Sequence, residues 1–128
     1  MAATEIIEHL PRPELMLEEI RRVLKKGGRA IITTPVKPIS GMTDKLHQQE
    51  FTPEQLKQLC RRYFNRVKIV TSHPLWLKKI YTWSLGQLDR YHLDVGRWLI
   101  NLLVLVSGWN PFINLPGKST QQLALCRK

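Results

Sequence analysis

The sequence PELMLEEIRRVLKKGGRAIITTP, residues 13–35, predicts a helix, a tight turn and a strand in immediate succession. Apolar residues recur every three or four positions in its first half, so we expect a helix over residues 13–26. The Gly27-Gly28 pair supplies the left-handed conformation in which helices commonly end. Residues 29–34 are apolar and β-branched, which predicts a short strand that is buried on both faces, as in a parallel sheet.

Helix and strand continue to alternate on the carboxyl side of this segment. A second helix is predicted to begin at Thr52, where Pro follows the cap and Gln55 completes a capping box. Residues 66–71 alternate between polar and apolar, as in a half-exposed strand, and residues 122–126 predict another short strand. This order of elements predicts an α/β architecture.

Residues 75–115 depart from that alternation. Their apolar residues recur at a spacing of three to four, which predicts one or two amphipathic helices, and all four tryptophans of the chain lie here. The continuous apolar run from Leu102 to Val106 is too short for a membrane span, which needs about 20 residues. Two interpretations stay open, namely helices that cover the protein's own sheet and a helix that lies in a membrane interface between flanking bases.

Length and composition limit the class of protein. The chain has 128 residues, 43% of them hydrophobic and 23% charged, which is one globular domain at most and excludes collagen, low-complexity disorder and a disulfide scaffold. Cys60 and Cys126 lie far apart without a CxxC spacing, so we interpret both as reduced core residues. The amino terminus lacks the basic region and the long apolar region of a signal peptide. We therefore expect a cytoplasmic protein, with peripheral contact to a membrane as the alternative.

The basic residues are concentrated in the carboxyl half. The net charge is +10, yet residues 1–55 hold eight basic and eight acidic residues, whereas residues 56–128 hold twelve basic and two acidic residues. This asymmetry indicates an anionic partner, which could be nucleic acid, an acidic membrane or an acidic substrate. A solvated basic surface without a specific partner is the other interpretation.

Four segments form a more specific pattern: EIIEHL at 5–10, IRRVLKKGG at 20–28, IITTP at 31–35 and HQQEFTPEQL at 47–56. Their order and spacing resemble the second half of class I S-adenosylmethionine-dependent methyltransferases. The resemblance covers about residues 3–72, and the strand at 121–126 resembles the family's final strand.

The resemblance implies an incomplete Rossmann-like methyltransferase fold that contains the second half of the sheet. Residues 1–128 would form the carboxyl-terminal portion of one methyltransferase domain, with a helical, Trp-rich insertion at 73–117 before the last strand. The family holds its cofactor, S-adenosyl-L-methionine, with a G-x-G-x-G loop and an acidic residue that follow the first two strands. Residues 1–128 contain no G-x-G-x-G sequence, so we expect this chain to be part of a longer protein and inactive alone.

The resemblance also assigns candidate site residues. Thr4 and Glu5 would lie at the carboxyl end of a central strand, beside the methionine part of the cofactor, which is the edge where open α/β sheets bind ligands. Glu8 would face the substrate. His9 is the first candidate for the base that takes the acceptor's proton, and His47 is the second. In the alternative interpretation these side chains only cap or bridge neighbouring elements.

Glu5, Glu8, His9 and His47 also resemble a ligand set. Metal-dependent small-RNA 2′-O-methyltransferases carry two Glu and two His at matching places, and such mixed ligands suit Mg²⁺, Mn²⁺ or Fe²⁺. The basic carboxyl half favours RNA. Residues 75–115 have few bases among their aromatics, however, so nucleic acid is not the partner that we expect.

Three functions follow as hypotheses. The first is methyl transfer from S-adenosyl-L-methionine to a small or lipid-like acceptor. The second is a stand-alone interaction module that binds an anionic membrane or a partner protein, with residues 75–115 as the contact. The third is a fragment of a metal-dependent RNA ribose methyltransferase. In each case an incomplete sheet would expose an edge, so we expect self-association.

Overall fold

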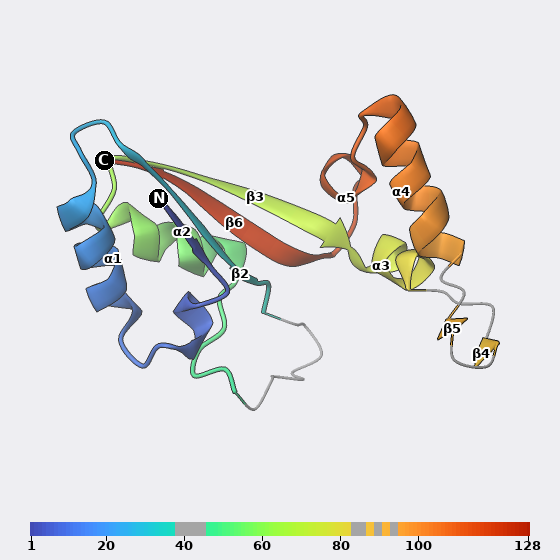
Figure 1. Ribbon diagram of the computed structural model, residues 1–128. Coiled ribbons are helices and arrows are strands. Elements are labelled where there is room, and N and C mark those ends of the chain that lie inside the picture. The colour runs from blue at the N-terminus through green and yellow to red at the C-terminus, as the bar shows by residue number, and fades with distance from the viewer. Residues whose placement is uncertain (38–45, 83–86, 89–90, 93–94) are drawn as a thin grey trace. The chain divides into compact units, whose positions relative to one another are not determined.

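The computed structural model describes residues 1–37, 46–82, 87–88, 91–92 and 95–128, and it divides into two compact units (Figure 1). The first unit contains residues 1–71 and 120–128, and the second contains residues 72–119.

A four-stranded sheet with the strand order β1-β2-β6-β3 organises the first unit. β1 pairs with β2 in parallel, and β2 pairs with β6 antiparallel, so the sheet is mixed. The predicted α/β fold is confirmed. The strand bounds are β1 Ala2–Thr4, β2 Arg29–Pro35, β3 Arg66–Pro74 and β6 Ser119–Arg127.

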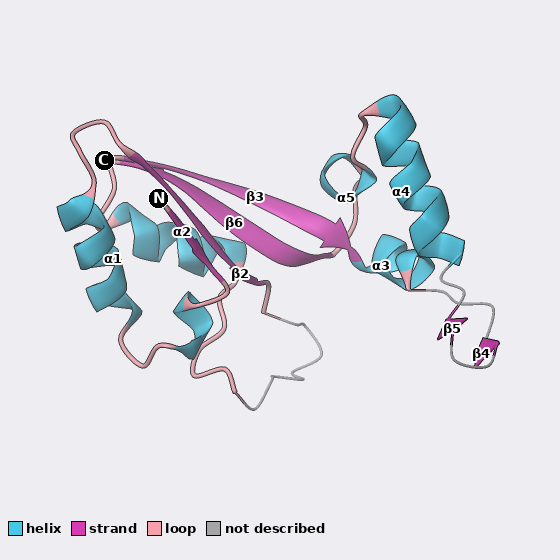
Figure 2. Cartoon of the chain, in the orientation of Figure 1, coloured by secondary structure: helices cyan, strands magenta, loops and turns pink. Residues whose placement is uncertain are grey.

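Two helices, α1 (Pro13–Val23) and α2 (Pro53–Arg61), pack on the same side of the sheet (Figure 2). Thr52 caps α2 as predicted, because its hydroxyl accepts from the Gln55 amide and the Gln55 side chain accepts from the Thr52 amide. The core combines apolar side chains from both helices and the sheet, among them Leu17, Ile20, Ala30, Ile32, Leu56, Cys60, Phe64, Ala124 and Cys126.

The opposite face of the sheet corrects one prediction. β2 is not buried on both faces: its residues alternate, with Ala30 and Ile32 buried while Ile31 is 42% exposed. Its register partner in β6, Leu125, is also exposed. The prediction assumed helices on both faces of the sheet, whereas α1 and α2 both pack on one.

The first helix is also shorter than predicted. α1 ends at Val23 rather than at residue 26, because Leu24 takes an extended conformation. The Leu24 carbonyl accepts a hydrogen bond from the Lys128 ammonium group at 2.7 Å, so a residue at the other end of the chain replaces a helical donor. Gly27 has the predicted left-handed conformation, with φ +74°, but it lies in the turn after Leu24 and does not end the helix.

The second unit contains the helices α3 (Leu75–Tyr81), α4 (Val95–Ser107) and α5 (Pro111–Asn114). Within the predicted helical segment, β4 (Gln87–Leu88) and β5 (Tyr91–His92) instead form a two-stranded antiparallel pair. Trp83 and Leu85, which belong to the segment predicted to be helical, lie outside the described residues. Among the helices described, none has the length and apolar character that crossing a membrane requires.

Candidate functional site

The candidate site begins where β1 ends, beside the carboxyl end of its parallel partner β2. Glu5 follows β1 with φ +51°, a left-handed conformation that turns the chain sharply. The short 3-10 helix η1 (Ile7–His9) comes next and carries two of the predicted site residues.

The two residues predicted to face the cofactor, Thr4 and Glu5, are tied to β2. Thr4 is the register partner of Thr33. The amide of Glu5 donates to the Thr33 carbonyl at 3.2 Å, and the Thr33 hydroxyl donates to Glu5 Oε1 at 3.0 Å. The carboxylate of Glu5 is therefore engaged with the sheet.

A loop that precedes α2 is fastened onto η1. The carbonyl of Glu8 accepts from the amides of Gln48 and Gln49, at 2.8 and 3.1 Å. The side-chain amide of Gln49 donates to the carbonyls of Leu10 and Pro11. These four hydrogen bonds hold the loop, and with it His47, next to η1.

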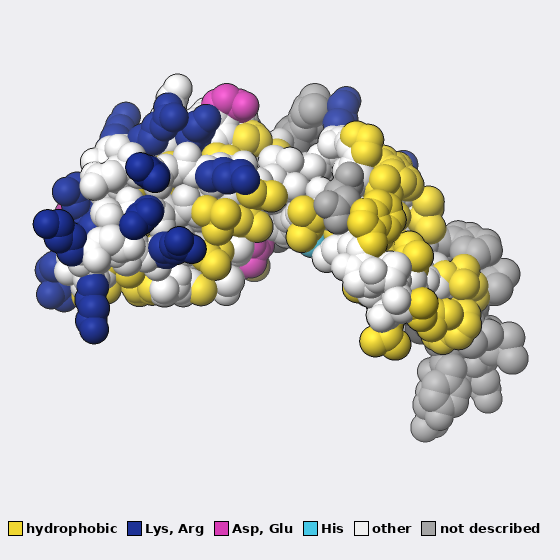
Figure 3. All heavy atoms as spheres, turned by 90° about the horizontal axis from the view of Figure 1, so that it is seen from above, with side chains coloured by type: hydrophobic (Ala, Val, Ile, Leu, Met, Phe, Trp, Pro, Cys, Tyr) yellow, Lys and Arg dark blue, Asp and Glu magenta, His cyan; other side chains and the backbone are white. Residues whose placement is uncertain are grey.

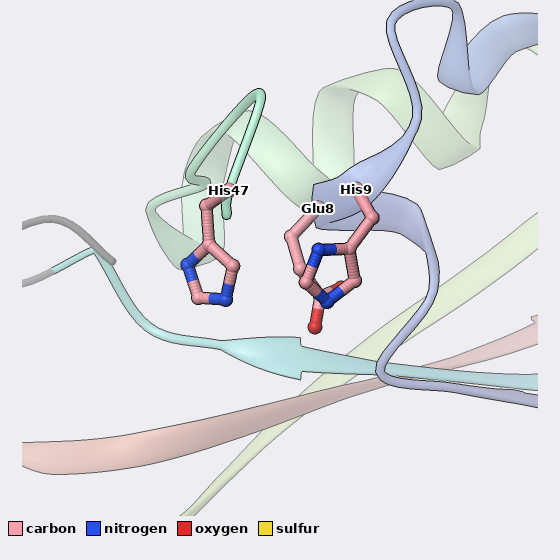
Figure 4. A group of neighbouring side chains, drawn as sticks. All are labelled: Glu8, His9 and His47. Atoms are coloured by element: carbon pink, nitrogen blue, oxygen red, sulfur yellow. The ribbon is translucent and has the colours of Figure 1, made fainter. Parts of the chain in front are cut away.

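The structure brings together Glu8, His9 and His47 (Figure 4). One potential ligand atom from each side chain lies within 4.8 Å of the others, and the two imidazole rings meet edge to face with centroids 5.0 Å apart. Glu8 is only 1% exposed, and its Oε2 has no hydrogen-bond partner among the described residues. A buried carboxylate oxygen in that state is costly, so it indicates a site that something else completes.

Each imidazole is oriented by an acceptor at Nδ1. His9 Nδ1 lies 3.1 Å from the Leu46 carbonyl, and His47 Nδ1 lies 3.5 Å from Glu50 Oε1. Because a carbonyl and a carboxylate can only accept, Nδ1 carries the hydrogen in both rings. Each neutral ring therefore keeps a lone pair at Nε2, which can take a proton or bind a metal ion.

Glu50 belongs to the site but was not predicted. It is mostly buried, pairs with His47 and has a second oxygen, Oε2, without a partner among the described residues. The signal was present in the sequence, since Glu50 follows His47 by three residues in the HQQEFT segment. Thr33, the partner of Glu5, was also missed. Of the four predicted metal ligands, Glu5 stands apart from the group that the other three form.

A family model and a solved structure agree with this architecture. Residues 1–32 match the family model of a methyltransferase domain. A SAM-dependent methyltransferase from Archaeoglobus fulgidus superimposes with a TM-score of 0.60 at 16% identity, and the match covers 99% of this chain and 57% of that chain. The [4+2]-cyclase SpnF has a TM-score of 0.49 at 20% identity, covering 99% of this chain and 49% of that one. No curated protein shows significant similarity.

The chain has the fold of part of a class I methyltransferase domain. It spans little more than half of the Archaeoglobus protein. The matched segment, residues 1–32, contains β1, η1 and α1, and thus two of the three clustered side chains. In this fold, Glu8, His9 and His47 gather at the edge of the sheet where the parallel strands β1 and β2 end.

Proposed function

We propose that this chain forms the acceptor side of an S-adenosylmethionine-dependent methyltransferase that acts on a small or lipid-like molecule. The observation that supports this most is the position of Glu8, His9 and His47 at the carboxyl ends of β1 and β2. Ligands of open α/β sheets bind at that edge. The methyltransferase-domain match over residues 1–32 supports the same assignment.

Residues 1–128 do not fit a complete cofactor site. The cofactor supplies the methyl group when bound, but no two of the seven glycines of the chain have the G-x-G spacing of the family's loop. The carboxylate of Glu5, a candidate contact, is already engaged by the Thr33 hydroxyl. The proposal therefore requires a glycine-rich loop from a polypeptide segment other than residues 1–128.

His9 is the better candidate for the base. Its side chain is exposed, its Nδ1 is held by the Leu46 carbonyl, and its Nε2 lone pair can accept the proton of an acceptor hydroxyl or amine. His47 is largely buried and lies beside Glu50, so it is better placed to orient His9, whose ring it contacts.

Calorimetric titration with S-adenosylhomocysteine tests the first part of the proposal. We expect no saturable binding to the 128-residue chain, and binding once the chain is part of the polypeptide or complex that supplies the glycine-rich loop. Saturable one-to-one binding to the chain alone would contradict the need for that loop.

Methyl transfer by that polypeptide or complex, followed with a radiolabelled methyl group and extracted small molecules and lipids, tests the second part. We expect H9Q to lower the turnover by about 100-fold or more, as for loss of a general base. H73Q is the matched control, because His73 belongs to the second unit. Equal turnover by H9Q and the unaltered protein would remove His9 as the base.

A second function is favoured by the partnerless oxygen of Glu8. We propose as an alternative that Glu8, His9 and His47 bind a divalent cation, which would acidify an acceptor hydroxyl in place of a histidine base. Glu8 Oε2 and the two Nε2 atoms would be the ligands, oriented by the acceptors at each Nδ1. Such a mixed set suits Mn²⁺, Mg²⁺ or Fe²⁺.

Titration with Mn²⁺, followed by electron paramagnetic resonance, tests this alternative directly. We expect one bound ion per chain, and affinity that falls by at least about tenfold in E8Q and H47Q. E54Q is the control, since Glu54 is an exposed carboxylate in the first turn of α2. Unchanged Mn²⁺ affinity in E8Q would exclude the cation and leave the histidine-base mechanism.

A further inference from the structure

The helix α4 of the second unit turns its apolar face outward. Six large apolar side chains are exposed on it, from 41% for Leu102 to 82% for Leu105. At 100° per residue they lie within an arc of about 160°. This outer face of α4 consists of Trp98, Leu99, Leu102, Leu103, Leu105 and Val106.

The other side of α4 packs on α3. Gly96 approaches the Ile80 carbonyl so closely that an added Cβ would lie 1.9 Å from its oxygen. The Arg97 guanidinium lies over the Tyr81 ring, 5.4 Å from the centroid, and the Tyr81 hydroxyl donates to Asn101 at 3.5 Å. α4 thus directs a charged and a polar side chain toward its own unit and leaves the leucines outside.

Hydrophobic side chains accordingly gather over the second unit in the space-filling view (Figure 3). A contiguous apolar surface of this kind is unusual on a protein that stays in water, and it marks a contact surface. Trp109 and Ile113, just beyond α4, are also exposed and extend the apolar surface in sequence.

The charge of the second unit indicates which kind of partner binds the outer face of α4. Residues 72–119 contain five basic and two acidic residues, of which Arg90, Asp89 and Asp94 fall outside the described part. Lys78 and Lys79 of α3 are exposed. A second copy of the unit would bring like charges together, whereas an anionic lipid surface would neutralise them.

The tryptophans and the length of α4 favour the same partner. Trp98 lies in the first turn of the helix and Trp109 two residues beyond its end, and Trp is the side chain preferred at the boundary between membrane and water. The 13 residues of α4 are about 20 Å long, too short to cross a bilayer but sufficient to lie in its surface.

We propose that the second unit binds anionic membranes through the outer face of α4, which lies in the interface between headgroups and acyl chains while Lys78 and Lys79 contact lipid phosphates. This inference does not depend on methyl transfer, because it uses only the second unit.

Co-sedimentation of the full chain with vesicles tests the proposal. We expect binding to vesicles that contain phosphatidylglycerol, much weaker binding to phosphatidylcholine alone, and weakening by salt. L105D/V106D should bind about tenfold more weakly or worse, because both side chains are more than three-quarters exposed and belong to the outer face. K78Q/K79Q should lose about fivefold per lysine, and only on the anionic vesicles.

L15D/V23D is the matched control, because it places the same two charges on exposed apolar positions of α1 in the first unit. Circular dichroism of each variant separates misfolding from lost binding. Binding that L15D/V23D reduces as much as L105D/V106D would overturn the proposal. So would a chain that binds no vesicle at low salt and forms a dimer that L105D/V106D dissociates, since the occupant would then be a second copy.

Discussion

At the scale of single residues, the burial of Glu8 lowers the stability of the folded protein. Its side chain is almost fully buried, yet one carboxylate oxygen has no hydrogen-bond partner among the described residues. Removing such an oxygen from water without a partner costs about 1–3 kcal/mol. A residue that served only the fold would avoid this cost, so the arrangement is easier to understand as a binding site beside His9 and His47.

The chain should therefore become more stable when Glu8 is replaced by an uncharged side chain of the same size. We expect E8Q to raise the free energy of unfolding by about 1 kcal/mol in the absence of divalent ions, because a neutral amide is less costly to bury than a carboxylate. Urea denaturation with added chelator measures this. E54Q, which alters an exposed carboxylate, should change little. A less stable E8Q protein would instead indicate a structural role for the carboxylate.

His73 makes the stability of the second unit depend on pH. Burial lowers its pKa below the ordinary 6.5, and the positive charge of Lys78 lowers it further. The unfolded chain then binds the proton first as the pH falls below 6.5. His73 therefore leaves stability unaffected above that pH, and destabilises the second unit as the pH falls from 6.5 through the lowered pKa.

Proton NMR of the histidine rings checks the prediction for His73. We expect it to titrate below pH 6.5, and K78Q to move its pKa upward, though not fully, because the contribution of burial remains. K79Q removes the same charge one residue away and serves as the control. An equal shift in K79Q, or none in K78Q, would contradict the assigned cause.

The residues of the candidate site show what the sequence could predict. Glu8, His9 and His47 were predicted individually, and a resemblance suggested that they meet although the two histidines lie 38 residues apart in the sequence. Thr33 and Glu50 were not predicted, because their roles depend on hydrogen bonds formed when η1, β2 and the loop before α2 come together. No local pattern shows that Glu5 bonds to Thr33 rather than joining the histidines.

At the scale of elements, predictions succeeded where local chemistry decides and failed where contacts decide. The capping box at Thr52 and the left-handed conformation of Gly27 depend on neighbouring residues, and both formed, although Gly27 does not end α1. α1 ends before Leu24, whose carbonyl bonds to Lys128 from 104 residues away, and periodicity alone placed the end too late. The pairing of Leu88 with Tyr91 likewise replaced a helix that spacing had predicted.

The packing of α3 against α4 should depend on one glycine. An added methyl group at Gly96 would meet the backbone oxygen of Ile80, which cannot rotate away as a side chain could. We therefore expect G96A to destabilise the second unit by about 2 kcal/mol although Ala favours helices. Limited proteolysis between residues 72 and 119 would report the loss. L103A, at an exposed position of the same helix, is the control and should be cleaved like the unaltered chain.

At the scale of the whole molecule, one face of the sheet is left exposed by the residues that the structure describes. Ile31 and Leu125 are register partners on that face and both are exposed. Arg29 and Arg127 are also partners, point to the same face and are exposed. β1 ends the strand order, so among the described residues it has β2 as its single neighbour. An apolar sheet face and an unpaired edge are both surfaces on which a further polypeptide can pack.

Self-association through this face should increase with salt. Two copies that bring their Ile31 and Leu125 side chains together also bring the positive charges of Arg29 and Arg127 close together. Salt weakens the repulsion between these charges, with a screening length of about 10 Å at 0.1 M. Sedimentation velocity should show a monomer at low salt and larger species as the salt concentration rises. I31D/L125D should remain monomeric, because it replaces the apolar contact with carboxylates.

L105D/V106D is the control for this experiment, since it alters the outer face of α4 in the other unit and should associate like the unaltered chain. The two surfaces therefore respond in opposite directions to the same variable: salt weakens attraction of the basic second unit to anionic lipid and strengthens contact between two basic sheet faces. Association that is strongest at low salt, or that L105D/V106D abolishes, would show that the uncovered face of the sheet is not the surface of contact.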